Sequence, residues 1–267
     1  MGNKFAAKVK FCLLPAAVGL LLFYLIPYGK VILYSVVKSQ YQKRFVGLRN
    51  YREVLENPYF QLACWNTLLM ILICVPLFVI LSIVISVFCM QRGRTGKLLH
   101  RMSILPLLLP SAGAVAAFSI LFGKIDNPFP VYGMFLWKYV GMGVVILTAA
   151  FSTVDPQIKE AARMDGAGMY VICRKIILPL CRKPLLFTVV LGIVYCFRTF
   201  RESFLYYNAN YPPDYSYTLQ YYMNNQFLKL KYQSMAAASV IVTVLLAGIV
   251  VLLERVLGER EALCGKK

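Results

Sequence analysis

The feature that most constrains this chain of 267 residues is a series of six long apolar segments separated by short polar stretches. The clearest of them, residues 64–90, contains no charged side chain. A helix needs about 20 apolar residues to cross a bilayer, and helices satisfy their backbone hydrogen bonds internally there. Charged residues make up 15% of the chain, against about 25% in soluble domains. We therefore predict an all-α, polytopic membrane protein with six transmembrane helices.

The order of the spans predicts the orientation of the chain. The expected spans are residues 11–29, 64–90, 102–123, 131–154, 185–207 and 234–253. The first follows several lysines, and we interpret it as an uncleaved helix whose N-terminus is cytosolic. Six spans then place both termini and the loops 91–101 and 155–183 in the cytosol. Basic residues favour that side, although the predicted outer loop 38–60 also carries several.

The net charge of +18 is spread between the apolar segments rather than along one basic face, which favours membrane anchoring over nucleic-acid binding. The eight cysteines have irregular spacing and His100 is the single histidine, so neither a disulfide framework nor a metal site is expected. Residues 93–98 resemble a P-loop, but the glycine spacing is wrong and Leu98 replaces the Mg²⁺-binding Ser or Thr. We expect this chain to bind no cofactor of its own.

The polar stretch 155–183 predicts the most ordered of the cytosolic loops. Asp155 can cap a helix at its start, and Gly166 and Gly168 can end that helix in a left-handed conformation. Ile158 and Ala162 lie one turn apart and predict a shared apolar docking face. A short capped helix transmits a push better than a flexible loop.

The same loop carries a family signature. It reads Glu-Ala-Ala, three residues, Gly, nine residues, Ile, one residue and Leu-Pro, and it resembles the EAA motif of ABC importer permeases. The residues that we assign to this motif are Glu160, Ala161, Ala162, Arg163, Asp165, Gly166, Ile176, Leu178 and Pro179. A chance amphipathic helix between two spans would not be expected to match so many fixed positions.

The resemblance extends along nearly the whole chain. Residues 45–51 (FVGLRNY), 57–60 (NPYF), 66–68 (NTL) and 137–141 (WKYVG) resemble carbohydrate-uptake permeases of the maltose-transporter type. The sequence departs from that family where Cys173 occupies a usually aromatic position of the EAA loop.

The resemblance implies a fold for this chain and separate roles for its partner subunits. The fold would be that of a type I ABC importer permease, with residues 1–267 as one transmembrane domain and residues 155–183 as its coupling loop. The chain would not be an enzyme. Two copies of a separate ABC ATPase, which bind ATP and Mg²⁺, would dock on this loop and drive alternating access. A second, non-identical permease and an extracytoplasmic sugar-binding protein would complete the importer in the plasma or inner membrane of a prokaryote.

Spans four and five carry the candidates for a substrate path. By position, the resemblance implies Tyr139, Met142, Gly143, Tyr195, Cys196 and Thr199. Arg198 and Glu202 are charged, lie one turn apart, and are predicted to pair with each other. That pair would either be structural or line an aqueous path for a sugar.

Two alternatives to a sugar permease remain open. Arg198 and Arg201 keep an anionic solute such as glycerol phosphate possible. A secondary transporter driven by an ion gradient would show repeated halves with interrupted spans, and the sequence shows no such repeat.

The tyrosine-rich loop 206–232 is predicted to form an interfacial belt, with Asp214 near a contact for the binding protein.

Overall fold

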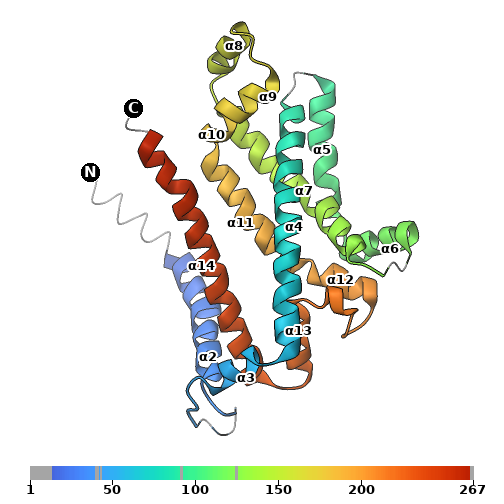
Figure 1. The fold of residues 1–267 in the computed structure, drawn as a ribbon, viewed down its shortest axis with the longest axis vertical. Helices are drawn as coiled ribbons and strands as arrows, with labels where there is room; N and C mark the ends of the chain where they lie inside the picture. The colour runs from blue at the N-terminus through green and yellow to red at the C-terminus, as the bar shows by residue number, and fades with distance from the viewer. Residues whose placement is uncertain (1–13, 40–41, 43, 91–92, 124–125, 265–267) are drawn as a thin grey trace. The chain divides into compact units, whose positions relative to one another are not determined.

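The computed structural model of this protein describes residues 14–39, 42, 44–90, 93–123 and 126–264 (Figure 1). Among these residues, five helices are long and apolar enough to span a membrane, or six if one sharply bent pair is a single span. Outside the helices, the described residues form a single isolated β-bridge, between Val37 and Phe45, and no strand. The prediction of an all-α polytopic protein is therefore confirmed.

The chain packs as two compact units, residues 1–61 with 223–248, and residues 62–222 with 249–267. The first unit contains η1 (Leu21–Leu25), α2 (Ile26–Ser35), α3 (Arg49–Leu55) and much of α14 (Tyr232–Cys264). The side-chain amide of Asn50 donates to the backbone carbonyls of Ser35 and Val37, at 2.8 and 2.9 Å. These bonds attach α3 to the end of the first span, which reaches Ser35 rather than residue 29.

The second unit is organised around α7 (Phe129–Ser152), which is the most buried of the candidate spans. Its neighbours are α4 (Pro58–Cys89), α5 (Arg94–Leu108) and α11 (Arg182–Arg198). A Cβ atom added at Gly141 would lie 1.7 Å from the carbonyl oxygen of Ser103 in α5. One added at Gly143 would lie 2.2 Å from Oγ of Ser82 in α4. Because glycine has no side chain, both helices approach α7 more closely than any other residue would permit.

The third predicted span is not one continuous helix. α5 is followed by α6 (Ser111–Phe122), and the two helices are bent by 101° at the break between them. Pro110 stands in this break and has no N–H to donate. It also holds Leu109 in an extended conformation, with ψ 138°. The expectation of a single helix over residues 102–123 was wrong for this reason.

The predicted cytosolic loop forms four short helical segments: α8 (Pro156–Met164), α9 (Met169–Ile172), η2 (Cys173–Ile177) and α10 (Leu178–Leu180). Figure 1 shows α8 and α9 at the same end of the second unit as the last turn of α4 and the first turn of α5. The end of α4, the start of α5 and the helices α8 and α9 therefore share one end of the unit, as the predicted cytosolic location of the loops 91–101 and 155–183 requires.

The opposite end of the second unit is held together by the start of α4. After α11 the fifth span continues as α12 (Phe200–Tyr207), followed by η3 (Asp214–Ser216) and α13 (Leu219–Leu228). The Asn66 amide donates to the backbone carbonyls of Asp214 and Tyr217, at 2.5 and 2.9 Å. These bonds fix the tyrosine-rich loop to the second span.

Candidate functional site

The helix α8 is capped at both ends by its own sequence. Asp155 accepts a hydrogen bond from the backbone N–H of Gln157 at 2.8 Å, as predicted for a helix N-cap. At the other end, Gly166 adopts φ 79°, and the N–H of Ala167 donates to the carbonyl of Ala162 at 2.9 Å. This is a Schellman arrangement, which needs a left-handed residue at the Gly166 position. Gly168 was wrongly assigned the same role, because its φ is −68°.

The two faces of α8 have different environments. Glu160 and Ala161 are exposed, and Met164, one turn after Glu160, is 87% exposed. Ala162 instead packs against a core beneath the helix. Ile158 is exposed and Ala162 is half-buried, and docking through these two residues stays a prediction. Met164 was missed, although its spacing from Glu160 places both on one side of a helix.

The core beneath α8 belongs to the end of α7 and to the rest of the loop. Its buried members are Leu147, Phe151, Val154, Ile172, Ile177 and Cys181. The motif residues Ala162, Ile176 and Leu178 pack against it, while Arg163, Asp165 and Gly166 are exposed and Pro179 is half-buried. The EAA signature therefore divides into residues that build the loop and residues that face outward.

Two hydrogen bonds attach the loop to the last turn of α7. Nζ of Lys159 donates to the carbonyl of Phe151 at 3.0 Å, and the Cys181 thiol donates to the carbonyl of Ala150 at 3.4 Å. The last carbonyls of a helix have no partner within the helix. Lys159, near the start of the loop, and Cys181, near its end, therefore supply hydrogen bonds to two of them. Burial raises the pKa of the Cys181 thiol, which keeps it protonated and able to donate.

A cavity of about 460 Å³ opens beside the exposed part of α8. Lys159, Glu160 and Arg163 line it together with Met90 from the end of α4. Charged side chains of both signs thus line this cavity.

The candidates for the substrate path lie within the second unit, and most of them are buried in it. Tyr139 of α7 and Tyr195 of α11 stack with ring centroids 4.4 Å apart and an interplanar angle of 9°. Gly143 packs against Ser82, as described above, and Met142 is half-buried. Among the eight candidates, Arg198 is the exposed one.

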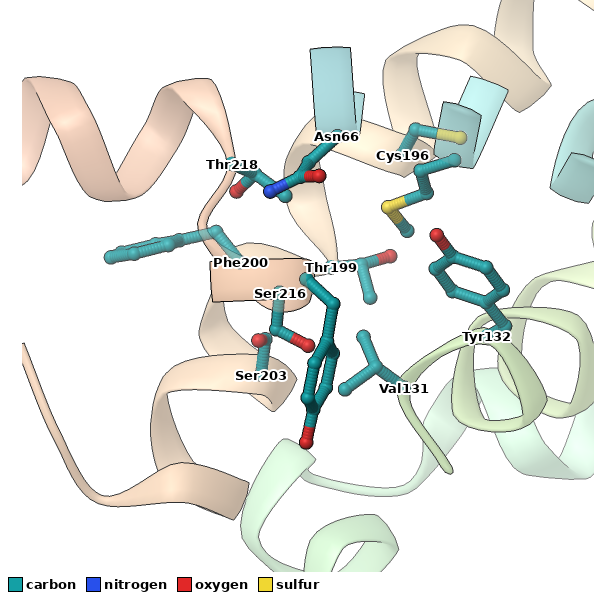
Figure 2. Close-up of a pocket in the computed structure, with 11 residues that line it drawn as sticks. Asn66, Val131, Tyr132, Cys196, Thr199, Phe200, Ser203, Ser216 and Thr218 are labelled. Carbon is teal, nitrogen blue, oxygen red and sulfur yellow. The ribbon is translucent and has the colours of Figure 1, made fainter. Parts of the chain in front are cut away.

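Cys196 and Thr199 line a small pocket, shown in Figure 2. Asn66 of α4 and Val131 and Tyr132 of α7 also point into it. Its volume of about 20 Å³ is enough for about one water molecule. In this conformation the pocket is too small for a sugar ring. Cys196 and Thr199 are buried among other residues of the same chain.

Glu202 is paired with a lysine from another span. Nζ of Lys138 in α7 forms an ion pair with Oε1 of Glu202 in α12, and the Ser111 hydroxyl at the start of α6 donates to the same oxygen at 2.7 Å. Lys138 also donates to Oγ of Ser111 at 3.1 Å. The exposed fractions are 2% for Glu202 and 8% for Lys138. This network joins three helices in the interior of the unit.

The predicted pairing of Arg198 with Glu202 was therefore wrong. α11 ends at Arg198 and α12 begins at Phe200, and Glu202 is turned inward while Arg198 is exposed. The guanidinium carbon of Arg198 lies 6.0 Å from the ring centroid of Tyr195. The sequence did contain a signal for the true partner, because Lys138 stands alone in an apolar span and a buried charge there requires a counter-charge.

Comparisons with known proteins agree with this architecture. Residues 63–260 match the family model described as binding-protein-dependent transport system inner membrane component. The chain is 27% identical to the arabinooligosaccharides transport system permease protein AraP of Bacillus subtilis (strain 168), over 89% of this chain and 83% of that protein. It is 25% identical to the sn-glycerol-3-phosphate transport system permease protein UgpA of Pectobacterium atrosepticum, over 90% of each chain.

Solved structures share the fold. A chain of a bacterial ABC transporter involved in the import of the acidic polysaccharide alginate superposes with a TM-score of 0.77, covering 96% of both chains at 17% sequence identity. A second alginate transporter structure, in complex with an alginate pentasaccharide-bound periplasmic protein, gives a TM-score of 0.72 over 94% of both chains at 19% identity. The family model covers well over half of the chain. This protein therefore belongs to the family of binding-protein-dependent transport system inner membrane components.

Proposed function

We propose that this chain is a permease subunit of an ABC importer that carries a carbohydrate across the membrane by alternating access. The observation that carries the proposal is the construction of α8, a helix capped at both ends that presents Glu160 and Ala161 outward. Lys159 bonds it to the end of α7. A force applied to α8 would therefore reach α7, and through the Lys138–Glu202 network would reach α6 and α12.

In this proposal the energy comes from two copies of a separate ATPase that dock on α8 and bind ATP and Mg²⁺ themselves. The chain itself catalyses no reaction. A second, non-identical permease and an extracytoplasmic binding protein complete the importer, and both termini lie in the cytosol. The names of the relatives support a carbohydrate or related solute, since one is a permease for arabinooligosaccharides.

A substitution on the exposed face of α8 tests the docking. We expect Ala161→Trp to abolish co-purification of the ATPase and ATP-driven uptake while the permease remains in the membrane. Leu180→Trp is the matched control, because Leu180 is 62% exposed in the same loop but lies outside α8. Unchanged ATPase binding by the Ala161 variant would contradict the proposed docking site.

The solute and the energy source are tested separately. Uptake of a panel of oligosaccharides and glycerol phosphate in cells lacking this subunit, with and without the restored gene, distinguishes a sugar importer from the UgpA-like alternative. Purified permease in proteoliposomes is expected to be inactive without its ATPase. Uptake by the permease alone under an ion gradient would instead identify a secondary transporter.

A further inference from the structure

The charge of Arg198 has no counter-charge among the described residues, although the residue lies well inside the fifth span. That span runs from Arg182 to Tyr207, and at about 1.5 Å per residue Arg198 stands roughly 24 Å along it. The carboxylate one turn away, Glu202, is occupied by Lys138 and Ser111. A charged side chain inside a membrane span is costly unless it is paired or lines a water-filled path.

Features of the helix itself offset only part of this cost. Arg198 is the last residue of α11, where the helix dipole stabilises a cation. Its cation–π contact with Tyr195 adds a further modest stabilisation. The remainder of the cost would be offset if an anion occupied the exposed side of the guanidinium during transport.

The guanidinium is held in place by a rigid aromatic support. Tyr195 is 5% exposed and Tyr139 is 4% exposed, and their stacked rings are contacted edge-on by Phe78, 6.4 Å from the ring centroid of Tyr195. Lys138 lies 5.7 Å from the centroid of the Tyr139 ring. Each tyrosine of the pair therefore contacts one cation, and Glu202 neutralises Lys138 but not Arg198.

We infer that Arg198 recognises a negatively charged group on the transported carbohydrate, so that the substrate is an acidic sugar. The inference rests on the proposed function and adds the substrate's charge to it. A guanidinium presents a planar fork of N–H donors that binds a carboxylate through two parallel hydrogen bonds. Because the contact with Tyr195 restricts the Arg198 side chain before the substrate arrives, less side-chain entropy is lost on binding.

The test uses the complete importer in proteoliposomes, with uptake of an oligogalacturonate trimer measured by mass spectrometry. The uncharged methyl ester of the same trimer is the neutral comparison, and a sugar phosphate distinguishes a carboxylate from a phosphate preference. The affinity of the isolated binding protein for each sugar is measured by titration. This separates selectivity of the binding protein from selectivity of the permease.

We expect the wild type to take up the acid in preference to its ester at equal occupancy of the binding protein. Arg198→Gln is expected to lower uptake of the acid at least about tenfold, the loss of one charge-assisted hydrogen-bond pair, and to leave ester uptake unchanged. Arg198→Lys is expected to retain part of the preference, because it keeps the charge and loses the fork. Arg201→Gln is the matched control, since Arg201 is exposed three residues away in α12, and should change uptake less than twofold.

Several results would overturn the inference while leaving the proposed function intact. One is wild-type uptake of the neutral ester as fast as uptake of the acid, together with uptake of the acid that Arg198→Gln does not lower. Another is an equal loss in the Arg201 and Arg198 variants, which would indicate a diffuse positive field rather than a site. A third is dissociation of the Arg198→Gln complex during size-exclusion chromatography, which would show that Arg198 serves assembly of the importer rather than binding of the substrate. Failure to move any sugar despite binding-protein-stimulated ATP hydrolysis would contradict the proposed function itself.

Discussion

At the scale of single residues, Gly166 has a conformation that other residues rarely adopt. Its φ of 79° closes the Schellman arrangement at the end of α8, and no atom lies within 4 Å of an added Cβ. A side chain there would thus be opposed by the backbone conformation, at about 1–2 kcal/mol, and by any partner docked over it. Gly168, two residues later, has ordinary negative φ and similarly open surroundings.

We therefore predict that Gly166→Val impairs uptake severely while Gly168→Ala does not. Both variants should reach the membrane in normal amounts, because neither substitution meets the core of the loop. Uptake assays together with quantification of membrane protein check this. Equal effects of the two substitutions would show that the left-handed cap has no role in coupling.

The Lys138–Glu202 pair provides a second prediction at this scale. Lys138→Met leaves Glu202 buried with an uncompensated charge, and breaking a buried pair in this way costs about 3–5 kcal/mol. Oε2 of Glu202 already has no hydrogen-bond partner among the described residues. We therefore expect no other donor there to compensate the carboxylate when Lys138 is removed. The single variant is expected to unfold at a clearly lower temperature in detergent.

The double variant Lys138→Met with Glu202→Gln should recover much of this loss, because both charges are then absent. A thermal-unfolding cycle over wild type, the two single variants and the double variant measures the coupling. Additive effects of the two substitutions would exclude a direct pair.

At the scale of elements, the decisive contact is the one between α8 and the end of α7. Lys159 is the fourth residue of α8, and its side chain reaches back to the carbonyl of Phe151. Cys181 reaches the neighbouring carbonyl of Ala150 from the other end of the loop. We expect a helix held in this way to move with α7 as one body, and a helix that lacks the contact to pivot independently.

We predict that Lys159→Ala uncouples ATP hydrolysis from uptake. The ATPase should still bind, because Glu160, Ala161 and Met164 remain on the exposed face, but the number of solute molecules moved per ATP should fall. Lys175→Ala is a suitable control, since Lys175 is an exposed basic residue of the same loop. A parallel fall in ATPase binding and uptake would show that Lys159 serves docking rather than transmission.

At the scale of the whole molecule, the placement of the loops carries the functional argument. α8, the end of α4 and the start of α5 lie at one end of the second unit, and the loop around Asp214 is bonded to the start of α4 at the other end. One end would therefore face the ATPase and the other the binding protein.

This arrangement predicts opposite accessibility for two exposed positions. In spheroplasts treated with a membrane-impermeant maleimide, Asp214→Cys should be modified, whereas Glu160→Cys should be modified only after the membrane is permeabilised. Site-resolved mass spectrometry separates these thiols from the native cysteines. The reverse pattern would invert the orientation inferred from the basic residues.

The sequence alone determined the all-α membrane class, the family and the capped helix of the EAA loop. Each depends on local information: the length of an apolar run, the spacing of motif residues, or the preference of Asp155 and Gly166 for helix ends. The same local logic placed Met164 and Glu160 on one side of α8, although we did not draw that conclusion from it.

The tertiary structure alone decided which charges meet and which faces are covered. Sequence proximity suggested Arg198 for Glu202, but Lys138 lies 64 residues away and reaches it because α7 packs beside α12. Pairings of this kind depend on how helices cross and on where a span breaks, as at Pro110 and Thr199. The periodicity of the sequence does not predict these pairings, because the free energy of a buried charge depends on the groups that the tertiary structure places beside it.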